Sequence, residues 1–74
     1  MAYALINSEL GKEDEVLEKL KTFPEVKEAH IVYGIYDIIA KLEAESLQIL
    51  KNTLISKIWI MDEVKSTSTL MLSE

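Results

Sequence analysis

Apolar and polar residues follow a pattern along the chain that predicts six secondary-structure elements. Two segments repeat apolar residues at steps of three and four, which predicts helices, and four segments alternate or are apolar throughout, which predicts strands. The order is strand, helix, strand, strand, helix, strand. The expected strands span residues 2–7, 26–33, 36–43 and 64–72, and the expected helices lie between Gly11 and Pro24 and from Ser46 to about Lys57.

Both helices have recognisable ends. Gly11 is an acceptable N-cap for the first helix, the acidic residues at 13–15 suit the positive end of its dipole, and Pro24 ends it. Ser46 is the expected N-cap of the second helix. Residues 58–61 form an apolar run too short to assign to helix or strand. The expected buried positions are Val16, Leu17 and Leu20 in the first helix and Leu47, Leu50, Leu54 and Ile58 in the second.

The two middle strands are predicted to form a hairpin around Gly34. Glycine reaches positive φ at little steric cost, so Gly34 and Ile35 suit the central pair of a type II′ turn, with Tyr33 facing Tyr36. In this register one face of the hairpin is wholly apolar and the other is mixed. The apolar face pairs Ile31 with Ile38 and Ala29 with Ala40, and the mixed face pairs Val32 with Asp37, His30 with Ile39 and Glu28 with Lys41.

The order of elements predicts a ferredoxin-like α+β fold, βαββαβ. Right-handed crossovers place both helices on one face of a four-stranded antiparallel sheet and leave the other face, the open face, uncovered in a single chain. We expect a second chain to cover this open face and form a dimeric α/β barrel. Residues expected on the open face are Tyr3, Leu5, Val32, Ile39 and Met71; the last strand is expected to carry Lys65, Thr67, Thr69 and Met71 on one side and Val64, Leu70 and Leu72 on the other.

Length and composition restrict the possible functions. The 74 residues make one domain, 1–74, and a net charge of −5 with no arginine argues against direct binding of nucleic acid. The absence of cysteine excludes disulfides and thiolate metal sites. No targeting segment or membrane-spanning run is present, so we expect a cytoplasmic protein. The richness in lysine and glutamate is in keeping with a thermophile.

Four short motifs, spread over nearly the whole chain, carry a family resemblance. The most specific are Gly-Ile-Tyr-Asp at 34–37 and Thr-Ser-Thr at 67–69, and EVLEKL at 15–20 and PEVKEA at 24–29 support them. With these motifs the chain resembles the RAM (regulation of amino-acid metabolism) domain, the ligand-binding half of the leucine-responsive regulator/AsnC family. Full-length members add an N-terminal helix-turn-helix that binds DNA. The chain shows no such segment, so we expect a stand-alone RAM domain.

The resemblance implies a function in sensing and assembly. Family domains pair through their sheets into dimers, dimers associate into larger rings, and an effector, usually an amino acid, binds between dimers. It implies that Gly34 and the backbone around Tyr36 approach the effector, that Asp37 meets its ammonium, and that Thr67 and Thr69 supply hydroxyls. No cofactor, metal or catalytic residue is expected. A role in transcription would involve a DNA-binding relative with the same domain.

Each of these residues also has a purely structural explanation. A tight turn alone would select Gly34, and strand propensity alone accounts for Thr67 and Thr69. Asp37 is harder to explain without a ligand, because strands disfavour aspartate and a covered carboxylate needs a cation. His30, a lone histidine, does not make a metal site.

Two other functions remain open at this point. Small ferredoxin-like monooxygenases use asparagine, tryptophan and histidine, and Asn7, Trp59 and His30 are present, although the expected strands do not bring them together. The chain lacks a nucleophile elbow, a phosphate loop and a His-Glu-His spacing. The third possibility is an assembly module that binds no ligand.

Overall fold

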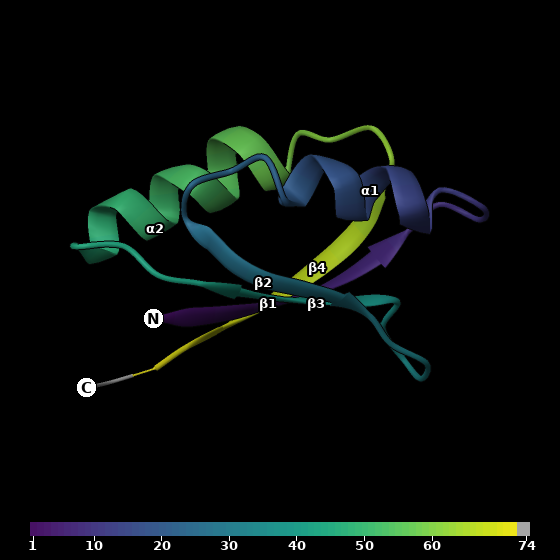
Figure 1. Cartoon of the computed structure of the whole chain (residues 1–74), viewed down its shortest axis with the longest axis horizontal. Coiled ribbons are helices and arrows are strands. Elements are labelled where there is room, and N and C mark those ends of the chain that lie inside the picture. The colour runs from purple at the N-terminus through teal and green to yellow at the C-terminus, as the bar shows by residue number, and fades with distance from the viewer. Residues whose placement is uncertain (73–74) are drawn as a thin grey trace.

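Four antiparallel strands and two helices form the domain in the predicted order (Figure 1). The computed structural model describes residues 1–72. Both helices lie on the same side of the sheet, which confirms the ferredoxin-like α+β fold. The elements are β1 (Ala2–Ser8), α1 (Glu13–Leu20), β2 (Val26–Ile31), β3 (Ile38–Leu42), α2 (Leu47–Thr53), the π-helical turn η1 (Leu54–Ile58) and β4 (Val64–Met71).

The two helices begin differently from each other. Ser46 caps α2 as predicted, because its hydroxyl oxygen accepts the N–H of Ile49 at 3.2 Å. The prediction that Gly11 caps α1 is wrong, since α1 begins at Glu13 and Lys12 occupies the cap position. Gly11 instead turns the chain at a φ of +80°, and its N–H donates to Oε1 of Glu13 at 3.0 Å.

A π-helical turn continues α2 and resolves the apolar run at 58–61. The N–H of Trp59 donates to the carbonyl of Leu54 at 2.8 Å, five residues back, and Ile58 ends the helical segment. Ile60 is 70% exposed, whereas Met61 packs against the core. The buried positions of the helices are confirmed except at two residues: Leu17 is only partly buried against the core, and Leu47 is 54% exposed.

The core lies between the helices and one face of the sheet. Alternate residues of β1 are buried there, as the period of a strand requires. The sheet order β2-β3-β1-β4 places β1 and β3 at the centre, where the helices cover them. The largest fully buried side chains are Ile6, Val16, Leu20, Ile38, Leu42, Leu50 and Ile58.

The hairpin has the predicted register and a different turn. Ile31 pairs with Ile38 and Ala29 with Ala40, as expected. The strands separate earlier, however, and a loop over 32–37 replaces the two-residue turn. Gly34 has a φ of +154°, whereas a type II′ turn needs about +60° at its first central residue. The expected pairing of Tyr33 with Tyr36 is also wrong, because Tyr33 is 98% exposed.

The last strand has the opposite orientation to the one predicted. Ala4 is opposite Thr69, Ile6 opposite Thr67 and Ala2 opposite Met71, so these three residues of β4 face the helices. Serine and threonine occupy both sides of β4, so the apolar pattern specifies its orientation weakly. The open face carries Tyr3, Leu5, Asn7, Glu28, His30, Ile39, Lys41, Ser66, Ser68 and Leu70. Leu70 takes the place of the predicted Met71, and the predicted Val32 lies instead in the loop that follows β2.

Candidate effector-binding site

Asp37 lies directly before β3 and fixes the end of β1. Its N–H donates to the carbonyl of Ile6 at 3.0 Å, and its carbonyl accepts the N–H of Val32 at 2.8 Å. Its Oδ2 accepts the N–H of Ser8 at 3.0 Å and faces the Ser8 hydroxyl at 3.4 Å. Ser8 is 6% exposed, so the carboxylate satisfies a polar group where the buried face of β1 ends. Asp37 therefore has a structural role that the strand pattern did not reveal.

An acidic cleft of about 360 Å³ lies beside Asp37. Glu13 and Asp14, from the first turn of α1, line this cleft together with Asp37, and no lysine of residues 1–72 lines it. Three carboxylates in one concavity favour a cationic group over an anion. The remaining walls come from Leu10, Ile31, Val32 and Tyr33.

Gly34 and Tyr36 lie near Asp37 in sequence and outside the acidic cleft. A Cβ added to Gly34 would meet nothing within 4 Å, so the space on the side-chain position of this residue is open. The phenol oxygen of Tyr36 is 2.9 Å from Oγ of Ser68. Ser68 is opposite Leu5, which places the end of the Tyr36 side chain over the open face. Tyr33, expected only to pack in the hairpin, lines the acidic cleft instead.

Thr67 and Thr69 face the helices, and Thr69 borders a second concavity. This apolar groove, of about 320 Å³, lies between α2, η1 and β4. The hydroxyl oxygen of Thr69 is buried and makes no hydrogen bond within residues 1–72. Its lining residues are Lys51, Leu54, Ile55, Trp59, Thr69 and Met71. The sequence analysis did not find this groove, although Ile55 and Trp59 stand apart from the buried stripe of the second helix.

The residues proposed for the effector therefore fall in separate places. Asp37 lines the acidic cleft, whereas Thr69 lines the apolar groove. The sheet order explains the separation, because β1 lies between β3 and β4. Tyr36 reaches Ser68 over the open face, on the other side of the sheet from Thr67 and Thr69. A single chain thus does not assemble the five residues around one ligand.

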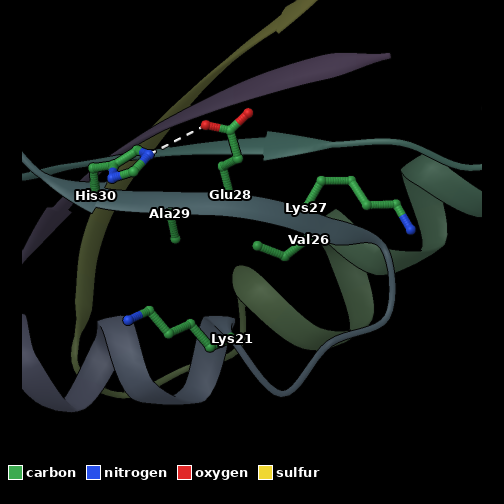
Figure 2. A pocket seen from close by; sticks show the side chains of 6 residues that line it. All are labelled: Lys21, Val26, Lys27, Glu28, Ala29 and His30. Atoms are coloured by element: carbon green, nitrogen blue, oxygen red, sulfur yellow. Dashed lines mark hydrogen bonds and ion pairs between the residues drawn. The ribbon is translucent and has the colours of Figure 1, made fainter.

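A third concavity, of about 410 Å³, follows the outer edge of β2 (Figure 2). Figure 2 shows Ala29 and Val26 pointing from β2 toward the helices and Glu28 and His30 pointing away from them. The register shifts between Val26 and Glu28, and Lys27 lies at this irregularity. A bulge and a lysine on an edge strand hinder the addition of another strand. None of the predicted effector residues lines this concavity.

The residues considered for a monooxygenase site lie on different parts of the domain. Nδ2 of Asn7 donates to Oγ of Ser66 at 3.3 Å on the open face. His30 is exposed at β2, with Nε2 3.3 Å from Oε1 of Glu28. Trp59 follows η1 on the helix side of the sheet and is 52% exposed.

Two ion pairs join α1 and η1 to the loop residues that directly precede β4 and β2. Nζ of Lys19 is 2.9 Å from Oε2 of Glu63; the hydrogen bond between them raises the pKa of Lys19 above 10.5 and lowers the pKa of Glu63 below 4.5. Nζ of Lys57 is 3.3 Å from Oε1 of Glu25. Burial would raise the pKa of Glu25, but its own backbone N–H and hydrogen bonds from Lys57 and Thr53 lower it on balance.

The order of the elements and the single four-stranded sheet place this small domain in the ferredoxin-like α+β class. Comparison with known proteins gives the family. The family model described as the Lrp/AsnC ligand binding domain matches residues 1–74, so the chain belongs to this family, as its motifs indicated. No helix within residues 1–72 has the length and apolar character to cross a membrane.

Relatives of the chain are transcription regulators. An uncharacterised HTH-type transcriptional regulator of Pyrococcus horikoshii is 34% identical over 73 residues, covering 99% of this chain and 46% of that protein. Regulatory protein AsnC of Escherichia coli K12 is 41% identical over 56 residues, 76% of this chain and 37% of AsnC. The chain thus spans less than half the length of these relatives.

A solved structure of similar length has the same fold. A hypothetical protein from Pyrococcus horikoshii is 46% identical, with a TM-score of 0.92 over 99% of this chain and 89% of that one. Relatives from Pyrococcus fit the thermophilic composition.

Proposed function

We propose that this domain binds a small α-amino acid as an effector and that binding controls the assembly of its chains. The observation that carries the proposal is the state of the Asp37 carboxylate. The protein fixes Oδ2 through Ser8, and no lysine or histidine of residues 1–72 forms an ion pair with this half-buried group. A carboxylate held in place by neutral donors is prepared to receive an ammonium group.

The remaining proposed residues complement the other groups of an amino acid. Hydroxyls of Thr67 and Thr69 can donate to a carboxylate, and the exposed Gly34, two residues before Tyr36, leaves room for a ligand. Because one chain keeps Asp37 apart from Thr69, the proposed site uses Asp37 of one chain and the threonines of another.

Assembly follows from the surface of the single chain. Tyr3, Leu5 and Ile39 are only half-buried on the open face, and Leu70 is 54% exposed. We propose that two chains pair through this face and that dimers then join into a larger ring. An effector that binds between dimers must favour the larger assembly, by the ratio of its affinities for the two states.

A related fold supports the choice of effector class. A transcriptional regulator of Neisseria meningitidis was solved as a complex with L-Met; it is 11% identical, with a TM-score of 0.85 over 99% of this chain and 49% of that one. The likeness itself concerns the fold. Because the matched relatives are transcription regulators, we propose that a DNA-binding relative with the same domain is the partner through which this chain acts.

A thermal-shift screen against the proteinogenic amino acids tests the proposal. A ligand at a hundred times its dissociation constant adds about 2.7 kcal/mol to the free energy of unfolding. Asp37→Asn removes the charge and keeps an oxygen for Ser8, so it should abolish the shift and preserve the fold. The matched control is Asp62→Asn, at an exposed carboxylate distant from the acidic cleft in the sequence, which should respond as the parent does. A full shift in Asp37→Asn would show that this carboxylate does not bind the effector.

Mixing two variants tests whether the site is shared between chains. Asp37→Asn and the double variant Thr67→Val, Thr69→Val should each fail to bind alone. When they are unfolded and refolded together, some sites receive Asp37 from one chain and both threonines from another, and binding should return in part. If mixing restores nothing while both variants still assemble, the site is not built between chains in this way.

A further inference from the structure

The open face carries the chain's single histidine beside an ion pair. Nε2 of His30 is 3.3 Å from Oε1 of Glu28, its neighbour on the same face of β2 (Figure 2). The other carboxylate oxygen of Glu28, Oε2, is 3.9 Å from Nζ of Lys41, which lies opposite Glu28 on β3. One carboxylate is therefore shared between a lysine, whose charge is permanent at neutral pH, and a histidine, whose charge depends on pH.

The three residues lie in a small concavity of about 80 Å³ on the open face. Two lysines, Lys21 after α1 and Lys27 on β2, border the neighbouring edge concavity together with His30. Figure 2 shows Lys21 on the helix side of β2, whereas His30 points to the opposite side. The open-face concavity is lined by Tyr3, Glu28, His30, Ile39 and Lys41. Among the side-chain types around these two concavities, histidine is the one that ordinarily changes charge between about pH 5 and 8.

The charges of this cluster are balanced while the imidazole is neutral. Lys41 supplies one positive charge and Glu28 one negative charge. A neutral imidazole donates to Glu28 in one of its two tautomers, so this hydrogen bond does not require a second proton. Protonation of His30 adds a positive charge, and Glu28, the single carboxylate that lines the concavity within residues 1–72, already has Lys41 as its cation.

A balanced face suits pairing with a second copy of the same chain. A two-fold axis places the same surface of each chain opposite itself, so any net charge on the face opposes its own copy. Protonation of both histidines would place two surplus charges on the covered faces. The His30 side chain is 64% exposed in the single chain, so its imidazolium is hydrated there and would lose this hydration when a second chain covers it.

We propose that His30 is a pH switch on the pairing of chains, which pair while its imidazole is neutral and separate when it is protonated. The inference rests on the pairing through the open face that is proposed above. Because the covered face disfavours the protonated imidazole, the paired state binds fewer protons than the free chains. Association is therefore strong above the titration of histidine and weakens as the pH falls through it. Lys41 sets this direction, because it already neutralises Glu28.

Sedimentation equilibrium of the full chain at about pH 8 and about pH 5.5 tests the switch, at constant ionic strength and without added amino acid. Each histidine that must lose its proton changes the association constant by up to about tenfold per pH unit, and a dimer contains two. We expect the dissociation constant of the parent dimer to be about tenfold to a hundredfold higher at the lower pH. Circular dichroism at both pH values checks that the chains stay folded.

Three variants assign the effect to the cluster. His30→Gln keeps a donor for Glu28 and does not titrate, so its dimer should be equally stable at both pH values. Lys41→Met leaves Glu28 without its lysine, so a protonated His30 becomes the balancing charge and acid should strengthen the dimer. Lys12→Met is the matched control, at the exposed start of α1, and should keep the pH dependence of the parent.

The outcomes separate the switch from the assembly itself. A parent chain that is monomeric at both pH values would disprove pairing, and the switch with it. A dimer of equal stability at both pH values leaves the proposed pairing intact and shows that the switch is wrong. The switch is also overturned if His30→Gln keeps the pH dependence of the parent. Should His30→Gln fail to pair at all, Lys41→Met decides: weakening by acid, as in the parent, contradicts the proposal, and strengthening supports it.

Discussion

The two faces of the sheet differ in chemistry although they alternate along the same strands. On β1, Ile6 is 0% exposed beneath the helices, whereas its neighbour Leu5 is half-buried on the open face. The helix-covered face of the central strands is almost wholly apolar. The open face instead sets Ile39 beside Lys41, with an ion pair from Lys41 to Glu28 at 3.9 Å between Nζ and Oε2.

This difference separates folding from association. Burial of the helix-covered face supplies the main favourable term for folding one chain. The open face carries charged groups that are well hydrated. Its apolar residues contribute a favourable burial free energy only when a second chain covers them. Changes on the first face should therefore alter stability, and changes on the second should alter the mass of the assembly that we propose.

The largest expected effect is on the helix-covered face. Ile6→Ala should lower the free energy of unfolding by about 2–5 kcal/mol, because it removes a fully buried side chain and leaves a cavity. Urea denaturation measures this loss. Leu5→Ala, one residue earlier, should cost much less in a chain kept dilute. Equal losses would remove the distinction between the two faces.

An effect of intermediate size is expected on the open face. Leu5→Asp should convert the proposed assembly into a folded species of 8.4 kDa, because burying a large apolar side chain contributes about 1.5–3 kcal/mol and an unpaired carboxylate would oppose contact between chains. Light scattering gives the mass, and circular dichroism checks the fold. Ile60→Asp, at a 70% exposed position outside this face, is the control. A parent protein that is itself 8.4 kDa would disprove assembly through this face.

A smaller effect is expected where the buried face ends. Asp37→Ala leaves the Ser8 N–H without its acceptor, so it should lower the free energy of unfolding by about 1–3 kcal/mol. Asp37→Asn keeps an acceptor oxygen and should lose less. Denaturation of both variants without ligand measures the difference. If the two variants lose the same, the Ser8 contact contributes little, and Asp37 would serve only its proposed ligand.

The smallest effect concerns the Lys19–Glu63 pair. The pKa of Glu63 is lowered from its ordinary value of 4.5. The Glu63 carboxylate therefore stabilises the folded chain above pH 4.5, and this stabilisation is lost as the pH falls through the folded-state pKa. Because the pKa of Lys19 is raised, the stabilising contribution of its charge is intact up to pH 10.5 and is lost at higher pH. Lys19→Met should thus reduce the melting temperature at neutral pH and match the parent at about pH 2. An equal reduction at both pH values would rule out this ion pair as the cause.

Much of the fold followed from local signals in the sequence. The periodicity of Val16, Leu17 and Leu20, and the Ser46 cap, identified helices whose stabilising contacts lie within a few residues. The hairpin register followed from matching apolar residues across it, since a slip of β3 by one residue would turn the buried Ile38 and Ala40 to the open face. The motifs at 34–37 and 67–69 gave the family.

Tertiary structure decided what these local signals left open. The orientation of β4 depends on its pairing with β1, because threonine and serine on both sides of β4 are nearly equivalent in water and only the partner strand distinguishes them. The contact between Asp37 and Ser8 joins residues 29 positions apart, so no local pattern encodes it. The apolar groove exists because η1 packs beside β4, which places Trp59 near Thr69. The sequence alone therefore determined the elements and the family, whereas packing between distant segments determined which side chains share a site.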